Sequence, residues 1–383
     1  MDFMLLKQVK NYDIQVETSL LINLTLPHTQ VNAKYNEHLE IQFGLENPEI
    51  TIKIMFKNTI TLLATILFLF SSCVKEVKEK LNPYNPEPKM DKLRAENGKN
   101  QTSMHFLVFG DSKGSKHFPG VLKRADSLQP DFCITTADLV NTGGGEKGTK
   151  DYRKLDSMGG WFMRKYPMWP TVGNHEESGG DDGVENFSNF FGMGKAMYSF
   201  EYGNAKFIGL PWPKVSEDSE KLKWLEKELK AAKGKHIFIF KHRPHYTLGS
   251  KGYKDVEGVE TATTKLYNKY NVTAVFSGHD HIYYRTKRNR TNYIISAGAG
   301  ASIYSLKREK DTIANDVYYG KRRKQEIEGG AVPYKFHAAD GTETDISESM
   351  FYVLSVKIEG NEVSIEMIDE KTGTIWDQAV IKQ

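Results

Sequence analysis

Side chains that can bind metals or transfer protons stand at the ends of apolar runs along this sequence. Each run is short enough for one strand, and the polar residue follows where the run stops. In an open α/β sheet the functional groups gather beyond the carboxyl ends of the strands, so residues distant in the chain can meet there. Carboxylates, imidazoles and an amide oxygen are together ligands suited to divalent metal ions. The residues in these positions are Asp111, Asp138, Asn174, His175, His242, His279 and His281.

Taken singly, each of these residues has an ordinary structural explanation. An Asp after a strand commonly caps a helix or forms a turn, and Asn174 after Gly173 is a typical turn residue. A His beside an apolar run is more often a hydrogen-bonded bystander than a ligand. Only the joint pattern of the seven residues therefore indicates a site.

The elements that must position these residues alternate between strand and helix. From residue 104 onwards, short apolar runs alternate with amphipathic stretches, and this alternation predicts an α/β protein. A hairpin is expected around Gly203 and Asn204. Residues 303–349, rich in charge and glycine, are expected to be a long irregular surface insertion. The expected strands cover 104–109, 131–136, 197–202, 205–210, 236–241, 272–277, 293–298, 350–359 and 362–369, and the expected helices cover 119–129, 217–232 and 261–270.

The composition is that of a globular protein with nearly balanced charge. The 383 residues include 52 Lys and Arg against 49 Asp and Glu, a formal net charge of +3. A nucleic-acid-binding module concentrates far more positive charge, so none is expected, and nothing indicates an obligate protein partner. The two cysteines, Cys73 and Cys133, exclude a disulfide framework and a cysteine-rich zinc site, and Cys133 is expected to be a buried hydrophobe.

One apolar stretch in the N-terminal third is too short to cross a membrane. Residues 59–70 read TITLLATILFLF, which is 12 residues against the roughly 20 that a spanning helix needs. Lys57 precedes the stretch, and Ser71, Ser72 and Cys73 follow it. This order resembles a bacterial lipoprotein signal, with Cys73 as the residue that is lipidated. The alternative is a buried core element of the same length.

The signal divides the chain into parts. Because a signal works at the start of a chain, we expect Met55 to be the initiator, 1–54 to be an upstream extension outside the fold, and 55–73 to be the signal peptide. Strand-like runs within 1–54 leave a genuine extension as the alternative. Residues 74–102 are expected to be a polar linker to a domain over 103–383. The expected location is the bacterial cell envelope, with the membrane as a partner through the lipid on Cys73.

Five short motifs carry the ligand-type residues in order along the chain. They are GD at 110–111, AD at 137–138, GNHE at 173–176, KHRPH at 241–245 and GHDH at 278–281. In this order they resemble the calcineurin-like metallophosphoesterase superfamily, and flanking text such as FSGHDHIYYRT resembles its purple acid phosphatase-like branch. The resemblance covers about residues 103–383. It implies a four-layer α/β/β/α sandwich of two mixed sheets.

The resemblance also implies a role for each residue. Two metal ions about 3.5–4 Å apart would clamp a phosphoryl group and generate a hydroxide that bridges them. His175 would face the substrate, either hydrogen-bonding a phosphoryl oxygen or protonating the leaving oxygen. Fe, Mn and Zn suit these donors almost alike, so the identity of the metals stays open. Asp138 would bridge both ions, Asp111 and His281 would bind the first ion, and Asn174, His242 and His279 would bind the second.

Two positions depart from the family pattern. Family members complete the first metal's shell with a His two residues after the first Asp or, in the purple acid phosphatase branch, with a Tyr three residues after the second; Lys113 and Asn141 stand there instead. Asn141 is a tentative ligand through its amide oxygen, or it orients His175, or it occupies a plain turn. Lys113 cannot ligate while protonated and is a tentative contact for substrate phosphate, so the first metal site is expected to be the weaker. Further tentative substrate contacts are Arg243, His245 and Tyr246.

The function that the resemblance implies is a lipid-anchored, metal-dependent phosphoesterase acting on phosphate mono- or diesters. One alternative is a degenerate, non-catalytic surface lipoprotein that binds metal or phosphate. Another is a cell-surface binding module whose metal ions are structural. The loops that select a substrate follow no general sequence code, so the substrate stays open.

Overall fold

The structure is a computed structural model that describes residues 82–98, 101–212, 215–251 and 261–382, together with three strands nearer the N-terminus. The chain divides into two compact units, Met1–Val77 and Lys78–Gln383. In the first, β1 (Ile14–Glu17), β2 (His38–Phe43) and β3 (Ile50–Met55) form an antiparallel sheet in that order. Met55 ends β3; the rest of the expected signal, Cys73 included, lies outside the described residues.

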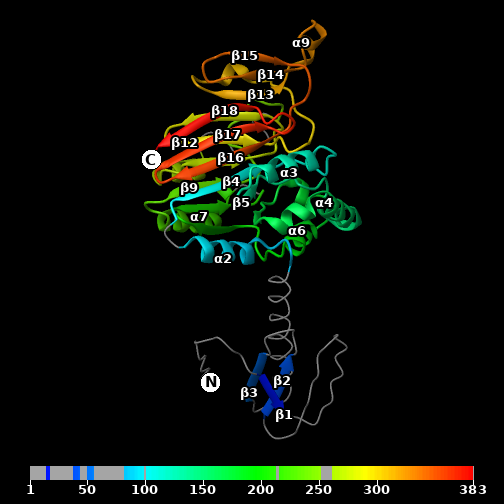
Figure 1. The fold of residues 1–383 in the computed structure, drawn as a ribbon, viewed down its shortest axis with the longest axis vertical. Helices are drawn as coiled ribbons and strands as arrows, with labels where there is room; N and C mark the ends of the chain where they lie inside the picture. Colours follow the sequence, from blue (N-terminus) through cyan, green and yellow to red (C-terminus); the bar gives the residue numbers. More distant parts are fainter. Residues whose placement is uncertain are drawn as a thin grey trace. The chain divides into compact units, whose positions relative to one another are not determined.

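Two sheets form the centre of the second unit (Figure 1). The strands of the nine-stranded sheet, in sheet order, are β15 (Glu343–Ile346), β14 (Tyr334–His337), β13 (Val317–Lys321), β11 (Tyr283–Arg288), β12 (Thr291–Ser296), β10 (Ala274–Ser277), β9 (His236–Phe240), β8 (Ala205–Gly209) and β7 (Tyr198–Tyr202). Those of the six-stranded sheet are β18 (Ile375–Lys382), β17 (Glu362–Asp369), β16 (Tyr352–Glu359), β4 (Ser103–Phe109), β5 (Phe132–Thr135) and β6 (Met168–Trp169). Both sheets are mixed, because β8, β9, β10 and β12 are parallel in one and β4, β5 and β6 in the other, while the remaining pairs are antiparallel.

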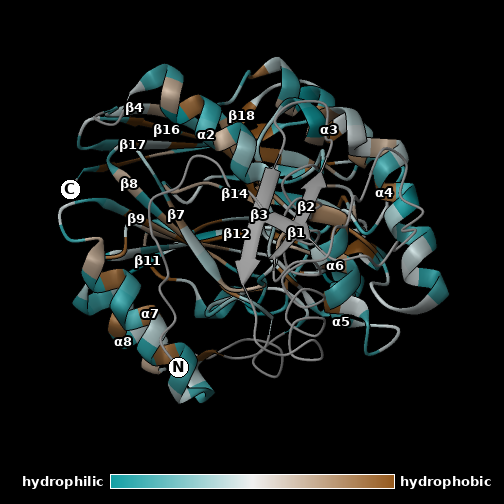
Figure 2. Ribbon diagram, turned by 90° about the horizontal axis from the view of Figure 1, so that it is seen from below, coloured by the Kyte–Doolittle hydropathy of each residue, from teal (hydrophilic) through white to brown (hydrophobic). Residues whose placement is uncertain are grey.

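Helices cover the outer face of each sheet (Figure 2). On the nine-stranded sheet, Leu225 and Leu229 of α7 pack with Ile239 of β9 in one hydrophobic cluster. On the six-stranded sheet, Leu122 of α3 and Phe162 of α4 belong to the main core. This arrangement confirms the four-layer α/β/β/α sandwich expected from the sequence. The helices of the unit are α2 (Pro86–Asn97), α3 (Phe118–Ser127), α4 (Gly145–Lys165), α5 (Asn174–Glu177), α6 (Gly183–Phe191), α7 (Ser219–Ala231), α8 (Ala262–Lys269) and α9 (Lys324–Glu328), with 3-10 turns η1 (Val215–Glu217) and η2 (Glu309–Asp311).

Aromatic rings fill the space between the two sheets. Phe106 of β4 is fully buried, and its ring meets those of Phe207 and Phe238 edge-on, with centroids 5.1 and 5.2 Å apart. On its own sheet, Phe106 stacks on Phe132 of β5 at 5.4 Å. Such edge-to-face and stacked pairs are favourable beyond the apolar area that they bury. The same packing fixes the position of β4 and β5, whose carboxyl ends carry Asp111 and Asp138.

We expect Phe106→Ala to lower the free energy of unfolding by about 3–5 kcal/mol, because the variant loses ring contacts on both sheets and leaves a cavity. Chemical denaturation followed by circular dichroism measures this change. Phe106→Leu, which keeps most of the buried volume, is the matched control and is expected to lose less. A loss below about 1 kcal/mol for the Ala variant would contradict this account of the core.

The expectation of an irregular insertion over residues 303–349 is wrong. This segment contributes β13, β14 and β15, which extend the nine-stranded sheet beyond β11. The sequence does not predict these strands because they contain charged residues. The charges are paired in the structure: the side chain of Lys335 is only 8% exposed, and its Nζ lies 2.5 Å from Glu309 and 3.0 Å from Glu343. Buried charges are tolerated when they are paired in this way.

The structure also differs from the linker expected over residues 74–102. Residues 86–97 form α2, which begins with Pro86 and is capped by Asn85, whose Oδ1 accepts from the amide of Glu87 at 3.0 Å. Asn85 also donates to the Gly192 carbonyl at 2.9 Å, and Met90 is fully buried. The described part of this segment therefore packs on the domain. Within the described residues, no helix is both long and apolar enough to cross a membrane.

Candidate metal centre

Parallel strands bring the ligand-type residues to one edge of each sheet. Asp111 and Asp138 follow the parallel neighbours β4 and β5, and His242 and His279 follow the parallel neighbours β9 and β10. Since parallel strands end on the same side, each pair emerges together. The two pairs meet across the sandwich, where the amide of His279 donates to both carboxylate oxygens of Asp111 at 3.1 Å.

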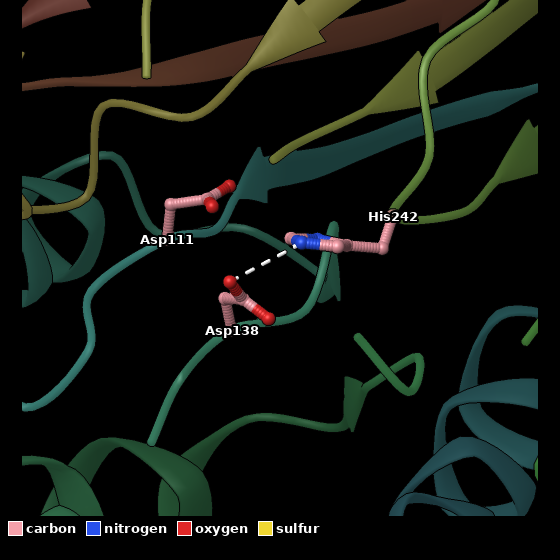
Figure 3. Close-up of side chains that lie close together, drawn as sticks. All are labelled: Asp111, Asp138 and His242. Atoms are coloured by element: carbon pink, nitrogen blue, oxygen red, sulfur yellow. Dashed lines mark ion pairs between the residues drawn. The ribbon is translucent and has the colours of Figure 1, made fainter. Parts of the chain in front are cut away.

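Three of these side chains, those of Asp111, Asp138 and His242, form a buried cluster (Figure 3). One ligand atom from each of Asp111, Asp138 and His242 lies within 4.8 Å of the other two. His242 Nε2 is 3.2 Å from Asp138 Oδ2, and His281 Nε2 is 3.3 Å from Asp111 Oδ1. Asn174, at the start of α5, joins the cluster through its Oδ1, which is 3.1 Å from His242 Nε2 and 3.0 Å from His279 Nδ1.

Strained backbone and glycines make room for this convergence. Asp111, Asp138 and His279 have φ values of 59°, 51° and 73°, in the left-handed region that residues other than glycine rarely adopt. Such strain persists where the surrounding structure holds it, and it is concentrated at functional sites. A Cβ on Gly278 would lie 2.3 Å from Asp111 Oδ2, and one on Gly173 would lie 2.3 Å from Asp138 Oδ1. The motifs therefore need these glycines so that the carboxylates can approach.

Backbone carbonyls orient two of the histidines. Nδ1 of His242 lies 2.7 Å from the Thr136 carbonyl oxygen, and Nδ1 of His281 lies 2.9 Å from that of Ser302. A carbonyl oxygen only accepts, so Nδ1 of each ring donates to it and the Nε2 of each ring faces the carboxylates. This is the arrangement by which metal-binding histidines are usually held.

The cluster fits metal ions. Asp138 Oδ2 and His281 Nε2 are buried, and neither has a hydrogen-bond partner among the described residues. Buried polar atoms without a partner are costly unless something else satisfies them. Carboxylate oxygen, amide oxygen and imidazole nitrogen together suit Fe, Mn or Zn. The residues present can therefore hold divalent or trivalent ions.

Burial and close charges shift the pKa values at the centre. Burial alone would raise the pKa of Asp138, but the imidazoles of His242 and His175 and the ammonium of Lys113 hold it below its usual value. Burial opposes the charge on His242, yet the carboxylates of Asp138 and Asp111 raise its pKa to about 9. For His279, burial and the neighbouring His242 lower the pKa to about 2. The neutral ring that a metal ligand requires is thus the favoured form of His279.

Glu176 supports the loops of the centre. Its side chain is buried, and its carboxylate accepts from three amides, those of Asp138 at 3.0 Å, Leu139 at 2.8 Å and Gly173 at 2.8 Å. Burial and the charge of Asp138 raise its pKa to about 7. Glu176 therefore ties the loop after β5 to the start of α5.

The comparisons with known proteins agree with this geometry. Residues 104–283 match the family model for calcineurin-like phosphoesterases. Residues 104–283 are therefore identified as a calcineurin-like phosphoesterase domain. The match begins at β4 and ends at β11, so it includes all seven residues of the cluster and its surroundings.

Purple acid phosphatases are among the relatives of this calcineurin-like phosphoesterase. Human tartrate-resistant acid phosphatase type 5 is 27% identical over 255 residues, which cover 56% of this chain and 78% of the relative. The Fe(3+)-Zn(2+) purple acid phosphatase 12 of Arabidopsis thaliana is 26% identical over 158 residues, 36% of this chain and 34% of the relative. The solved structure of purple acid phosphatase PPD1 from yellow lupin has the same fold, with a TM-score of 0.55 and 14% identity; the match covers 74% of this chain and 54% of that one. The human and Arabidopsis relatives are phosphatases, and a hydrolase is the class that they support for this chain.

His175 and Asn141 meet through the backbone. Nδ1 of His175 lies 2.6 Å from the Asn141 carbonyl oxygen, so it donates there and directs Nε2 to within 3.8 Å of Asp138 Oδ2. The His175 side chain is 25% exposed, so a substrate can reach it. Of the alternatives for Asn141, the geometry favours the one in which it orients His175, through its backbone carbonyl and not through its amide group.

Lys113 lies inside the centre. Its Nζ is 3.5 Å from Asp138 Oδ2, and its side chain is 17% exposed. An ammonium at this distance offsets negative charge that the metal ions would otherwise neutralise. The residue that departs from the family pattern therefore also contacts the carboxylate expected to bridge the ions.

The tentative substrate contacts separate into two groups. Arg243 lies at the centre, where its guanidinium carbon is 4.2 Å from the ring centroid of Trp212, and that ring lies 4.8 Å from the ring of His279. His245 and Tyr246 instead pack with Tyr293, at ring distances of 5.7 and 4.8 Å, and line a cavity to which none of the seven residues contributes. Their expected contact with substrate at the metals therefore has no support in this geometry.

The sequence does not predict two aromatic residues at the centre, Trp212 and Tyr304. Trp212 comes three residues after β8, a parallel neighbour of β9, so the rule that found His242 could have found it too. Tyr304 stacks on His281 with ring centroids 4.0 Å apart. It lies at the start of the segment expected to be irregular, and no motif marks it.

Proposed function

We propose that this chain is a dinuclear metal-dependent phosphoesterase that hydrolyses phosphate mono- or diesters. The observation that carries the proposal is the convergence of seven ligand-type residues in one cluster, where every member has a polar atom within 3.8 Å of another member: Asp111, Asp138, Asn174, His175, His242, His279 and His281. The family and its phosphatase relatives support the same reaction class.

The proposed ligand assignment follows the contacts of each side chain. Asp138 lies between the two halves of the cluster and would contact both ions. Asp111 and His281, 3.3 Å apart, would hold the first ion. Asn174, His242 and His279, linked at 3.0 and 3.1 Å, would hold the second ion. When bound, the ions would polarise the phosphoryl oxygens and lower the pKa of the attacking water.

His175 would act on the substrate directly. Its Nδ1–H donates a hydrogen bond to the Asn141 carbonyl oxygen, so only Nε2 can exchange a proton with substrate. When protonated, Nε2 can donate to a phosphoryl oxygen or to the ester oxygen as it leaves. The cations of Lys113 and Arg243 would offset charge on the phosphoryl oxygens.

The first metal site is proposed to be the weaker one, because Lys113 stands where family members have a His. We expect Lys113→His to raise the occupancy of this site, since it removes a cation 3.5 Å from Asp138 and adds an imidazole ligand. Elemental analysis after dialysis is expected to give close to two metal ions per chain for the variant and fewer for the natural protein. Lys113→Gln, which removes the cation without adding a ligand, is the control. Equal metal content in all three proteins would contradict the assignment.

The same lysine favours a second candidate function. If the ammonium of Lys113 takes the place of the first ion, the chain could bind metal or phosphate without turnover. The two functions differ in one experiment: elemental analysis of the purified protein, coupled to assays with a panel of phosphomonoesters and diesters and with Fe, Mn or Zn added singly. Metal-dependent hydrolysis of any ester supports the phosphoesterase. Bound metal with no hydrolysis in any assay supports the binding protein.

We further propose that the protein is anchored in the bacterial cell envelope by a lipid on Cys73. The support is the order of charged, apolar and small residues before this cysteine. Mass spectrometry of the protein expressed in a bacterium is expected to show a chain that begins at a lipidated Cys73, and Cys73→Ser is expected to abolish the modification. A native protein that retains residues 1–54 would contradict both the anchor and the expected initiator.

A further inference from the structure

A second cavity of about 460 Å³ lies apart from the candidate metal centre. Its wall is built from residues 245–248 after β9, from α8, from the end of β11 and from residues near η2. None of the seven residues of the metal centre lines it. Its volume falls within the range of small-molecule binding sites.

Positive charge predominates on the wall of this cavity. Among the described residues of the lining, Lys265, Lys287 and Arg288 contribute cations, and Asp311 contributes the one carboxylate. Asp311 is already paired, because Arg308 Nε donates to its Oδ2 at 2.7 Å. Lys265 and Lys287 form no ion pair with any residue that the structure describes. The two ammonium groups are therefore available to an anion.

Flat side chains and buried polar atoms complete the wall. The guanidinium carbon of Arg288 lies 5.2 Å from the ring centroid of Tyr246, and Arg288 Nη2 donates to the hydroxyl of Tyr284 at 3.2 Å. Two buried atoms of lining residues, Arg288 Nε and Asn268 Oδ1, have no hydrogen-bond partner within the described ranges. One of these atoms donates and the other accepts. Such orphaned groups are costly unless a ligand or water satisfies them.

We propose that this cavity binds a small organic anion that carries a planar ring and a phosphate or phosphonate group. The ring would pack against Tyr246 and Tyr284, and the anionic group would be held by Lys265, Lys287 and Arg288. This site is separate from the metal centre and does not depend on hydrolysis there. It also gives Tyr246 and its neighbour His245 a role other than contact with the substrate at the metals.

One hydrogen bond links the wall of the cavity to the loop that carries His279 and His281. Thr247 donates from its hydroxyl to the carboxylate of Asp280, the residue between His279 and His281. Burial raises the pKa of Asp280 to about 6, with Thr247 and His281 opposing the shift. An occupant of the cavity would therefore contact a loop that is tied to two metal-ligand candidates.

Isothermal titration calorimetry with phenylphosphonate tests the proposal. This probe has a ring and a dianionic group but no ester bond, so the protein cannot consume it by hydrolysis. The metal-loaded natural protein is expected to bind two equivalents, one at the metals and one in the cavity. Lys287→Glu, at an exposed position, is expected to weaken one equivalent at least tenfold and to leave the other unchanged. Lys123→Glu, the same change at an exposed position on α3, is the matched control and is expected to keep both equivalents.

Other results of the titration would overturn the cavity site or the class of ligand proposed for it. Two unchanged equivalents in Lys287→Glu, or a single equivalent that this substitution does not affect, would overturn the cavity site. Benzyl alcohol that binds as tightly as phenylphosphonate would overturn the anionic class of ligand. Failure of the phosphoesterase proposal is distinguishable, because the equivalent sensitive to Lys287→Glu would persist in a protein that hydrolyses no ester.

Discussion

Replacing His175 by Asn is expected to reduce phosphoester hydrolysis by about 10²- to 10⁴-fold while the metal content stays unchanged. His175 contributes no ligand in the proposed assignment, so its removal leaves the buried donors in place. What the variant loses is a proton donor whose Nδ1 is fixed at 2.6 Å from the Asn141 carbonyl oxygen and whose Nε2 faces the centre. The measurement is the rate of hydrolysis of p-nitrophenyl phosphate and of its bis-ester, together with elemental analysis of the same preparation.

His337→Asn is the matched control for this variant. The two histidines have the same exposed fraction, 25%, but His337 lies on β14 and stacks on Tyr318, outside the metal centre. The control is expected to keep full activity. Equal activity in His175→Asn and the natural protein would refute the role assigned to His175, and a loss of metal in that variant would make it a ligand.

The sequence predicts the centre of the fold well because the signals there are local. Apolar runs match β4, β9 and β10 to within about three residues at each end; Gly and a polar residue follow the runs at β4 and β10, and Lys241 and His242 follow the run at β9. The rule that parallel strands end on one side then brings Asp111, Asp138, His242 and His279 together without any knowledge of the sheet order. The hairpin of β7 and β8 follows for the same reason, since Gly203 and Asn204 separate two apolar runs.

The parts that the sequence does not predict depend on contacts between distant residues. The sequence of β14 is typical of a charged surface segment. The pairing of Lys335 with Glu309 and Glu343, which allows the strand to be partly buried, forms only on folding. α2 has few apolar residues; Asn85 ties its start to the Gly192 carbonyl at the end of α6, and Met90 is buried in the main core. In both cases tertiary contacts override a polar local pattern.

In the metal centre, too, some features follow from the sequence and others depend on contacts that form only on folding. The types and order of the motif residues predict which side chains meet, and the glycines of the motifs have a physical reason in the close approach of Gly173 and Gly278 to the carboxylates. Their supporting contacts are not predictable, because the Thr136, Asn141 and Ser302 carbonyls that orient three histidines belong to the backbone, which any residue type supplies. The place of His245, on the wall of the other cavity, is not predictable for a related reason. Its closeness to His242 in the chain does not fix the direction of a loop after a strand.

Asp138→Asn is expected to remove most of the bound metal and to lower hydrolysis by at least about 10³-fold, since metal ions supply several kcal/mol of stabilisation to a developing phosphoryl charge. The amide has nearly the same shape as the carboxylate but carries no charge. Its NH₂ group, placed at Oδ2, would face His242 at 3.2 Å and the Lys113 ammonium at 3.5 Å. The carboxylate that lies between both halves of the cluster is therefore lost without a change in packing, and elemental analysis together with circular dichroism separates this loss from unfolding.

Asp340→Asn, a change of the same size at an exposed turn, is expected to alter neither metal content nor activity. The contrast with His175→Asn is the informative one. If Asp138 bridges the ions, its variant loses metal and activity together, whereas the His175 variant loses activity alone, because one residue holds the ions and the other acts on the substrate. A variant at Asp138 that retains two metal ions per chain would show that this carboxylate does not bridge them, and the convergence of the cluster would then have to be explained by a single ion with Lys113 in place of the second.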